Sequence, residues 1–327
     1  MIAVLAGVNT GCATSGESRP SEPTAAVAAT HGPPAFKHAT FQHDMSPVGD
    51  VIRLFGEQVG GGIVLMSGLE ERAMPAIELR NTPYQDAVGQ FAASVDCTYL
   101  YTPYYYMIVA PGYESLQDVC IQDALDDRYH SMSASVVLGA KTELYNAFSA
   151  LSKSVGATIV ADNFIAEART GEMFLHDAPF HVVLEAILQS ARIAPGAFVV
   201  ESGPEYIFIR SQQNADTGNR LLNAGALTRE QRTLLSTVVS LTLPDSRAVS
   251  HAAFTSIPIP LHDALLPLTE QMGVEIVAQR HLADIPINPC VMDDVRLETA
   301  LNLLLWQWPM PDFGFEVQEN RILIRER

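Results

Sequence analysis

Apolar positions recur at helical spacing at three places along the chain, and each time a glycine and a short apolar run follow. In the first place, one apolar face repeats with a period near 3.6 residues; it consists of Val48, Val51, Ile52 and Phe55. Gly60 comes soon after this face, and the pair Ile63-Val64 begins three residues beyond the glycine. This order predicts an amphipathic helix that ends at Gly60 and is followed by a strand.

The same order returns twice more without a gap, which predicts an internal repeat. Gly156 follows Gly60 by 96 residues, and Gly273 follows Gly156 by 117 residues. The aligned segments read GGGIVLMSGLEERAMPAIELRN, GATIVADNFIAEARTGEMFLHD and GVEIVAQRHLADIPINPCVMDD. Upstream, HATF aligns with ASVV and with HAAF, and we expect the first strand of each copy there, at 38–41, 134–137 and 251–254.

A second amphipathic helix follows in each copy. Asn81, Asp177 and Asp294 stand at equivalent positions just before it. A side-chain oxygen at such a position can accept hydrogen bonds from the free amides of the first helical turn. We therefore expect these three residues to cap the second helices. The β-rich runs that close each copy are interrupted by turn residues and predict a hairpin.

Each copy thus reads strand, helix, strand, strand, helix, strand, strand, a unit of about 75 residues that can fold alone, but marginally. The predicted fold class is α+β, with three tandem small βαββαββ modules that have split mixed sheets. We expect the modules at residues 37–111, 133–211 and 251–327. Residues 112–132 and 212–250 are expected to link them, and the second linker is expected to carry a further short helix and a strand.

The glycine run at the start of the repeat has two interpretations. Glycines beside an apolar run can hold a phosphate, but that site needs a strand before the glycines and a helix after them. Here the helix comes first, so we expect Gly60 and its two equivalents to be left-handed helix stops. Gly61 and Gly62 align with other residue types, and nothing in the repeat requires glycine there. Pro267 is expected to kink the first helix of the third copy or to shift its start.

Charge and composition narrow the partners. The chain has 327 residues, of which 48% are hydrophobic, and 37 acidic against 20 basic residues give a formal net charge of −17. An acidic chain repels the phosphates of nucleic acids and anionic lipids, so neither is expected as a direct partner. No apolar run is long enough for an ordinary transmembrane helix.

The N-terminus suggests a lipid anchor. MIAVLAGVNTGC is apolar and ends at Cys12, which resembles the end of a bacterial lipoprotein signal, where the cysteine is lipidated after cleavage. The alternative is a chance apolar start with an ordinary cysteine. Residues 13–36 are small, polar and rich in proline, and this composition predicts a flexible tether. We expect residues 1–12 to form the signal and the lipid on Cys12 to be the only contact with the membrane.

The other cysteines and the histidines offer few candidates for chemistry. Cys97 and Cys120 could pair in an oxidising periplasm or remain two free thiols. Cys290 lies on the inward face of a period-two pattern, so we expect a buried core thiol rather than a nucleophile. The three His-Asp pairs fall at different places in the unit, and the sequence has no zinc, nucleotide or hydrolase motif. No enzyme activity, metal or cofactor is expected.

The run YLYTPYYYMIV is the most distinctive surface candidate. A hairpin buries only some of its rings, and exposed tyrosines are favoured at protein interfaces. Two alternatives are equally open, namely an interface with a partner or packing against the neighbouring linker or unit. The candidate interface residues are Tyr99, Tyr101, Tyr104, Tyr105 and Tyr106. Exposed edges of small split sheets could also pair with partners.

The repeated unit resembles the short periplasmic domains at the N-termini of secretins and of TonB-dependent transducers. The segments that carry the resemblance in the first copy are SPVGDVIRLFGEQVG, IVLMSGL and ELRNTPYQDAVGQFAASVDCTYLY. TELYNAFSALSKSVGATIV and LHDALLPLTEQMGVEIV carry it in the other two copies. The likeness covers most of residues 38–327, and no pore segment or barrel follows the third copy. A secretin or receptor itself is therefore not expected.

The resemblance implies work between proteins. Such domains stack into periplasmic rings or dock on inner-membrane partners in secretion and pilus machines. We therefore expect a lipoprotein scaffold, anchored to the outer membrane on its periplasmic side, that binds envelope proteins or self-assembles into a ring. The alternative is a periplasmic signalling or ligand-binding module, as in the transducers.

Overall fold

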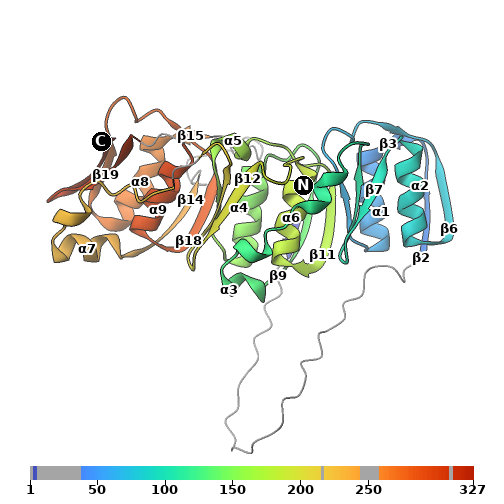
Figure 1. Cartoon of the computed structure of the whole chain (residues 1–327), viewed down its shortest axis with the longest axis horizontal. Helices are drawn as coiled ribbons and strands as arrows, with labels where there is room; N and C mark the ends of the chain where they lie inside the picture. The colour runs from blue at the N-terminus through green and yellow to red at the C-terminus, as the bar shows by residue number, and fades with distance from the viewer. Residues whose placement is uncertain (1–2, 6–37, 215–216, 244–257, 309–311) are drawn as a thin grey trace, which may run out of the picture.

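The computed structural model describes residues 3–5, 38–214, 217–243, 258–308 and 312–327. Within these residues the chain is a mixed α+β protein, as the sequence predicts. Three modules lie in a row along the long axis of the molecule, with module 2 in the middle (Figure 1). Module 1 spans residues 38–111, module 2 spans 133–214, and module 3 comprises the described part of 238–327.

The modules share one order of elements. Module 1 contains β2 (His38–His43), α1 (Val48–Val59), β4 (Ile63–Leu65), β6 (Ile77–Pro83), α2 (Tyr84–Ser94), β7 (Thr98–Tyr101) and β8 (Tyr106–Val109). Module 2 contains β9 (Ser133–Leu138), α4 (Leu144–Val155), β10 (Ile159–Ala161), β11 (Met173–Pro179), α6 (Phe180–Ser190), β12 (Phe198–Ser202) and β13 (Ile207–Ser211). Module 3 contains β14 (Val238–Leu243), α8 (Leu261–Met272), β16 (Glu275–Ala278), β18 (Cys290–Arg296), α9 (Leu297–Trp306), β19 (Phe313–Val317) and β20 (Arg321–Glu326).

Smaller elements complete the modules. Two-residue strands pair in modules 1 and 3, namely β3 (Ser46–Pro47) with β5 (Ala73–Met74) and β15 (Ile259–Pro260) with β17 (Pro286–Ile287). Module 2 has the extra helix α5 (Asn163–Ala166). Near the N-terminus, β1 (Ala3–Leu5) pairs antiparallel with β9, whereas cleavage of the predicted signal before Cys12 would remove this strand.

Each module has a split sheet. The first strand pairs antiparallel with the strand that precedes the second helix, as β2 does with β6, β9 with β11 and β14 with β18. The short Ile-Val strand instead pairs in parallel with the last strand of the hairpin, as in the order β4-β8-β7. β10-β13-β12 and β16-β20-β19 repeat that order. The two helices of each module bury their apolar faces against these strands.

The repeated glycine ends the first helix, as predicted. Gly60, Gly156 and Gly273 have φ angles of 67°, 64° and 62°, and each donates its N–H to the carbonyl four residues before it at 2.9 Å. Glycine adopts this left-handed conformation without a steric penalty from Cβ. Pro267 neither shifts the start of α8 nor shortens it, because α8 has 12 residues, as do α1 and α4.

The prediction that Asn81, Asp177 and Asp294 cap the second helices was wrong. Pro83, Pro179 and Arg296 occupy the cap positions instead. The three polar residues lie within the preceding strand at φ angles of 51°, 48° and 50°. At each of them the strand pairing shifts, so that two residues face one residue of the first strand, which is a β-bulge. Asn and Asp are the non-glycine residues that most readily adopt this conformation.

A hydroxyl group closes each bulge. The N–H groups of Asn81, Asp177 and Asp294 donate to the side-chain oxygens of Thr40, Ser135 and Ser240 at 3.3, 2.9 and 3.2 Å. The shared hydrogen bond makes Thr40 of module 1 equivalent to Ser135 of module 2. The alignment of HATF with ASVV instead makes Thr40 equivalent to a valine. The first strand of module 2 is therefore shifted by one residue from the predicted alignment.

The first strand of module 3 comes from the expected linker. β14, within residues 212–250, pairs with β18 in the way that β2 pairs with β6, so the predicted module boundary at 251 is corrected. HAAF, at 251–254, lies outside the described residues. The expected short helix of this linker is α7 (Arg229–Leu235).

The prediction that nothing requires glycine at positions 61 and 62 was also wrong. A Cβ on Gly61 would lie 2.4 Å from the ring of Tyr84, and one on Gly62 would lie 2.1 Å from the carbonyl oxygen of Tyr104. Modules 2 and 3 have Phe180 and Leu297 in place of Tyr84, and neither has a hydroxyl to accommodate. In module 1, glycine is therefore required at position 61 by the ring of Tyr84 and at position 62 by the backbone of Tyr104.

The linker at 112–132 packs against module 2. It contains two short 3-10 segments, Glu114–Asp118 and Gln122–Ala124, and the helix α3 (Asp127–His130). Its apolar side chains are buried, and Glu185 of α6 accepts a hydrogen bond from the N–H of Ile121 at 2.9 Å.

Candidate functional site: the module joints

The tyrosine run splits between the core of module 1 and its surface. Tyr105 and Tyr106 are each only 1% exposed, whereas Tyr101 is 42% exposed and Tyr99 and Tyr104 are half-buried. Tyr106 packs against Tyr84, Tyr99 and Tyr101. The hydroxyl of Tyr105 donates to Oε1 of Gln189 in module 2 at 2.5 Å. Tyr105 thus belongs to an interface within the chain, and Tyr101 is the ring most open to solvent.

Modules 1 and 2 meet at a joint that we call joint 1. β11 of module 2 pairs antiparallel with β4 of module 1, so one part of each split sheet joins a single sheet with the order β1-β9-β11-β4-β8-β7. Phe174 packs on α1, where a Cβ added to Gly56 would lie 2.7 Å from the Phe174 side chain. Except for Val160 and Phe208, the buried apolar residues of modules 1 and 2 form a single cluster.

Modules 2 and 3 meet at a second joint, joint 2. β18 of module 3 lies against β10 and α4 of module 2, although β10 and β18 belong to separate sheets. The indole ring of Trp306 packs against Tyr206 and Phe208 of module 2 with ring centroids 5.7 and 5.5 Å apart. Val160 and Phe208 belong to the apolar cluster of module 3 rather than to that of their own module.

One hydrogen bond recurs at both joints. The N–H of Ser67 donates to the carbonyl of Ser190 across joint 1 at 2.8 Å, and the N–H of Asn163 donates to the carbonyl of Gln307 across joint 2 at 3.0 Å. These donors and acceptors occupy equivalent repeat positions, since 96 residues separate the donors and 117 separate the acceptors. The two joints therefore share this hydrogen bond, and successive modules meet through equivalent segments.

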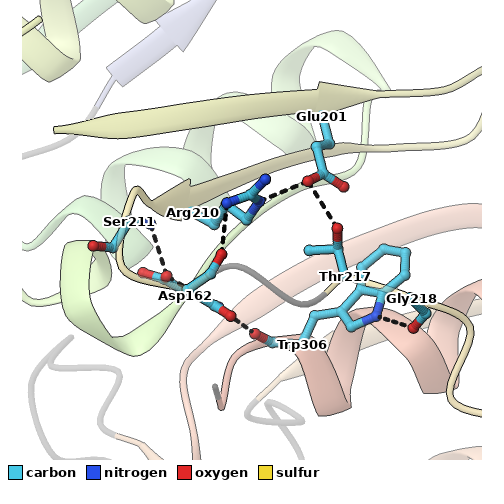
Figure 2. A network of polar contacts seen from close by, with 8 residues as sticks. Asp162, Glu201, Arg210, Ser211, Thr217, Gly218 and Trp306 are labelled. Carbon is cyan, nitrogen blue, oxygen red and sulfur yellow. Dashed lines mark hydrogen bonds and ion pairs between the residues drawn. The ribbon is translucent and has the colours of Figure 1, made fainter. Parts of the chain in front are cut away.

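A buried polar network reinforces joint 2 (Figure 2). Asp162 caps α5 by accepting from the N–H groups of Phe164 and Ile165, both at 3.1 Å. Its second oxygen accepts from the N–H of Ser211 at 2.8 Å and from Nδ2 of Asn214 at 3.2 Å. Asn214 also donates to the carbonyl of Trp306 across the joint at 3.3 Å. The network thereby links the loop after β10 to the end of α9.

A second part of this network holds the chain between the modules. Arg210 pairs with Glu201 at 2.6 Å, and the same carboxylate accepts from the hydroxyl of Thr217 at 2.8 Å (Figure 2). Nε1 of Trp306 donates to the carbonyl of Gly218 at 3.1 Å. These contacts fix the segment that leaves module 2 on the side of module 3.

Each joint buries one carboxylate. Burial raises the pKa of Asp162 above the ordinary range of an aspartate, against the opposing effect of its hydrogen bonds from Ser211 and Asn214. At joint 1, burial likewise raises the pKa of Glu172, against the N–H of Ala140 and the nearby charge of Arg53. Both groups act in positioning, because their oxygens accept from backbone N–H groups.

The cysteines remain separate. Cys97, Cys120 and Cys290 are free, so the alternative of a Cys97–Cys120 disulfide does not occur in this structure. Cys97 accepts a hydrogen bond from Arg72 at 3.4 Å, whereas Cys120 is exposed on the linker that packs on module 2. Cys290 is a buried core thiol, as predicted, and burial raises its pKa to about 12. Cys12 lies outside the described residues.

The histidine-aspartate pairs lie apart, as their places in the repeat predict. His43 binds the backbone of Asp44, His176 binds Ser135 at a bulge, and His262 lies 3.2 Å from the carboxylate of Asp263. In the described part of the chain, no three His, Cys, Asp or Glu side chains cluster in a way that could hold a metal ion.

A groove of about 430 Å³ opens beside joint 2. It is lined by Asn163, Phe164, Glu167, Pro258, Pro286, Asn288 and Trp308.

Sequence reasoning missed the joints, although it found the modules. The signal was present in two differences between the copies. Phe174 and Val291 occupy a strand position that holds Glu78 in the first copy, and Gln189 and Trp306 occupy a helix position that holds Ala93. Large side chains at the same outward position of copies two and three are expected where each packs on the preceding module.

Comparisons of the chain with protein-family models, with curated proteins and with solved structures find no match. None of the helices in the described residues combines the length and the apolar character that crossing a membrane requires.

Proposed function

We propose that the protein is a periplasmic scaffold that holds other envelope proteins at fixed positions along a stiff row of three modules. It would be a lipoprotein component of a secretion, pilus or related machine, tethered to the outer membrane through Cys12. The repeated joint is the observation that carries this proposal. Two joints with the same hydrogen bond and buried apolar contacts would keep the modules from moving independently.

A stiff row suits a scaffold better than it suits an enzyme. Interfaces between domains of one chain are usually small and polar, and relative motion is then the default expectation. Joint 1 instead continues a sheet and a hydrophobic core from one module into the next. The raised pKa values of Asp162 and Glu172 follow from burial at the joints.

Fractionation and pull-down test the proposal together. The full chain with a C-terminal affinity tag is expected in the outer-membrane fraction, and a Cys12→Ser variant in the soluble periplasm. Mass spectrometry after mild solubilisation should identify the same envelope proteins with the wild-type chain in independent preparations, and fewer with the variant. A wild-type chain that is soluble, unlipidated and free of envelope partners would contradict the proposal.

The groove beside joint 2 favours a second candidate, a ligand-binding module. Apolar grooves at domain interfaces are common sites for small ligands, and Phe164 is 57% exposed beside it. A ligand in this groove would change the fluorescence of Trp308, which lines it. A titration with periplasmic extract fractions that leaves the tryptophan emission unchanged would remove this candidate.

A further inference from the structure

The outward face of module 3 presents the surface that modules 1 and 2 use to bind the next module. This face comprises the edge strand β16, the outer side of β20 and one side of α8. β16 is the edge of its sheet among the described residues, whereas the equivalent strands β4 and β10 lie against β11 and β18. We call it the terminal face.

Two apolar positions on the strands of the terminal face are more exposed than their equivalents in modules 1 and 2. Val277 is half-buried, whereas the equivalent Val64 and Val160 are 0% and 2% exposed. Leu323 is likewise half-buried, whereas Met107 and Phe208 at the equivalent register are both 0% exposed. The difference arises because the next module covers the two upstream positions.

Leu266 gives the clearest sign of a missing partner. It is 54% exposed on α8, at the repeat position that Arg53 occupies on α1. Arg53 lies 3.9 Å from Glu172 across joint 1, so this position faces the following module. An exposed leucine is common on a protein surface by itself. Here it stands on the helix that packs beside β16, an open strand edge on which Val277 is only half-buried, and this combination is typical of an interface.

The outward face of module 1 is not a matching partner. At the position where Phe174 and Val291 contact the preceding module, module 1 has Glu78, which pairs with Arg80 at 2.5 Å. Head-to-tail contact between two copies would bury this ion pair against α8 near Thr269, the equivalent of Gly56, at a cost in desolvation. Charged side chains also protect a sheet edge from pairing. Module 1 thus ends the row with a polar face, as terminal repeats do.

We infer that the terminal face binds the same face of a second copy about a two-fold axis. A strand edge can pair antiparallel with itself, as β11 pairs with β4 at joint 1, and a two-fold contact is self-complementary. The apolar positions would then meet each other. The surrounding charges have both signs, since Glu275 lies in register with Arg321 and Arg325 pairs with Glu316 at 2.6 Å. A two-fold axis can therefore set acidic groups of one copy against basic groups of the other.

This dimer goes beyond the proposed scaffold role and does not depend on it, because it concerns the purified chain without membranes. A dimer would double the length of the row and present two module 1 faces at its ends. Binding by β16 would also remove the exposed strand edge from pairing with other chains.

Sedimentation of the purified full chain, with Cys12→Ser to exclude effects of a lipid, tests the inference. The chain should pass from monomer to dimer between about 1 and about 100 μM. Leu266→Asp should raise the dissociation constant at least about tenfold. Met45→Asp is the matched control, because Met45 is also an exposed apolar side chain, at 73%, but lies in module 1, outside the terminal face. It should leave the dissociation constant unchanged.

Hydrogen exchange locates the contact in the same samples. Protection of 275–278 should rise with protein concentration, while protection of 77–83, the edge of module 1, should stay constant. A chain that remains monomeric would overturn the inference, as would equal effects of the two aspartate variants. Protection that rises in both segments would overturn it in favour of a head-to-tail polymer.

Discussion

Joints 1 and 2 connect the same parts of successive modules, but they do so with different chemistry. Joint 1 is largely made of backbone, since β4 and β11 pair and join two sheets. Joint 2 is largely made of side chains, since Trp306 and the network around Asp162 connect modules whose sheets remain separate. The hydrogen bond from Ser67 or Asn163 is common to both.

The residue at one repeat position, Gly171 in module 2 and Asn288 in module 3, explains why strands pair at joint 1 and not at joint 2. Gly171 lies so close to β4 that an added Cβ would be 2.0 Å from the carbonyl oxygen of Leu65. The equivalent residue in module 3 is Asn288, whose side chain needs the space that the glycine leaves empty. Strands can approach closely where a glycine stands, and where a side chain stands they cannot. The polar side chains at joint 2 therefore take over the positioning that backbone pairing provides at joint 1.

Replacing the indole ring of Trp306 should cause the largest loss of stability, and the size of that loss measures how much this ring contributes to joint 2. Trp306 is 6% exposed and packs on Phe208 and Tyr206, so Trp306→Ala should lower the free energy of unfolding by about 3–5 kcal/mol. Gln189→Ala, at the equivalent position of joint 1, should cost only about 1–2 kcal/mol. Urea unfolding followed by circular dichroism measures both. Equal losses would mean that the joints do not differ in the way described.

The glycine itself provides the next test. Gly171→Asn makes joint 1 resemble joint 2 and should separate β11 from β4, at a cost of about 2–3 kcal/mol from lost hydrogen bonds and displaced packing. Gly225→Asn is the control, because an added Cβ there meets no atom within 4 Å. The amide of Leu65 donates to the backbone carbonyl of Glu172 at 2.7 Å, and it should exchange faster in Gly171→Asn alone. Unchanged exchange would show that close approach at Gly171 is not what joins the sheets.

A smaller effect should follow from the tyrosine that crosses joint 1. Tyr105→Phe leaves Oε1 of Gln189 without its donor in a buried site, so we expect a loss of about 1–2 kcal/mol. Tyr101→Phe should change stability by less than about 0.5 kcal/mol, since that ring is 42% exposed. Thermal unfolding of the two variants distinguishes the tyrosine of the joint from the tyrosine of the surface. A larger loss for Tyr101→Phe would contradict this assignment.

The smallest expected effect is in the pH dependence of stability, and here the joints should agree. Because burial raises the pKa of Asp162 in the folded state, the folded chain binds a proton more tightly than the unfolded chain does. The stability of the wild type relative to Asp162→Asn should therefore fall as pH rises above about 4, the pKa of an unperturbed aspartate, and level off beyond the folded-state pKa. Glu172→Gln should give the same sign at joint 1.

Unfolding free energies of both variants across the acidic range measure this dependence. A wild-type stability that rises relative to the variants over that range would contradict the effect assigned to burial.

Local patterns predicted what happens inside a module. The helical spacing before Gly60 and the left-handed stop at that residue depend on a few neighbouring residues, and both were correct. The bulges at Asn81, Asp177 and Asp294 were missed, because a polar residue before a helix also fits an ordinary cap. The hydroxyl groups that identify a bulge stand about forty or more residues earlier, on the paired strand.

Contacts between modules were harder to predict because repetition hides them. The search for an internal repeat looks for what the copies share, whereas the joints consist of what they do not share, such as Phe174 against Glu78. The sequence pointed to Tyr105 as an interface residue, but not to Gln189 as its partner. Gly61 was judged dispensable for the same reason, since it lies against Tyr84, a tyrosine found in only one copy.

Amide hydrogen exchange at the joint donors tests the central claim, that equivalent hydrogen bonds fix the three modules in one row. At dilute concentration, the amides of Ser67 and Asn163 should both exchange slowly, because each donates to a carbonyl of the following module. Arg280 holds the equivalent position in module 3, where the described residues place no further module, and its amide should exchange fast. Fast exchange at Ser67 and Asn163, at the rate of Arg280, would show that the modules move independently and would contradict the account.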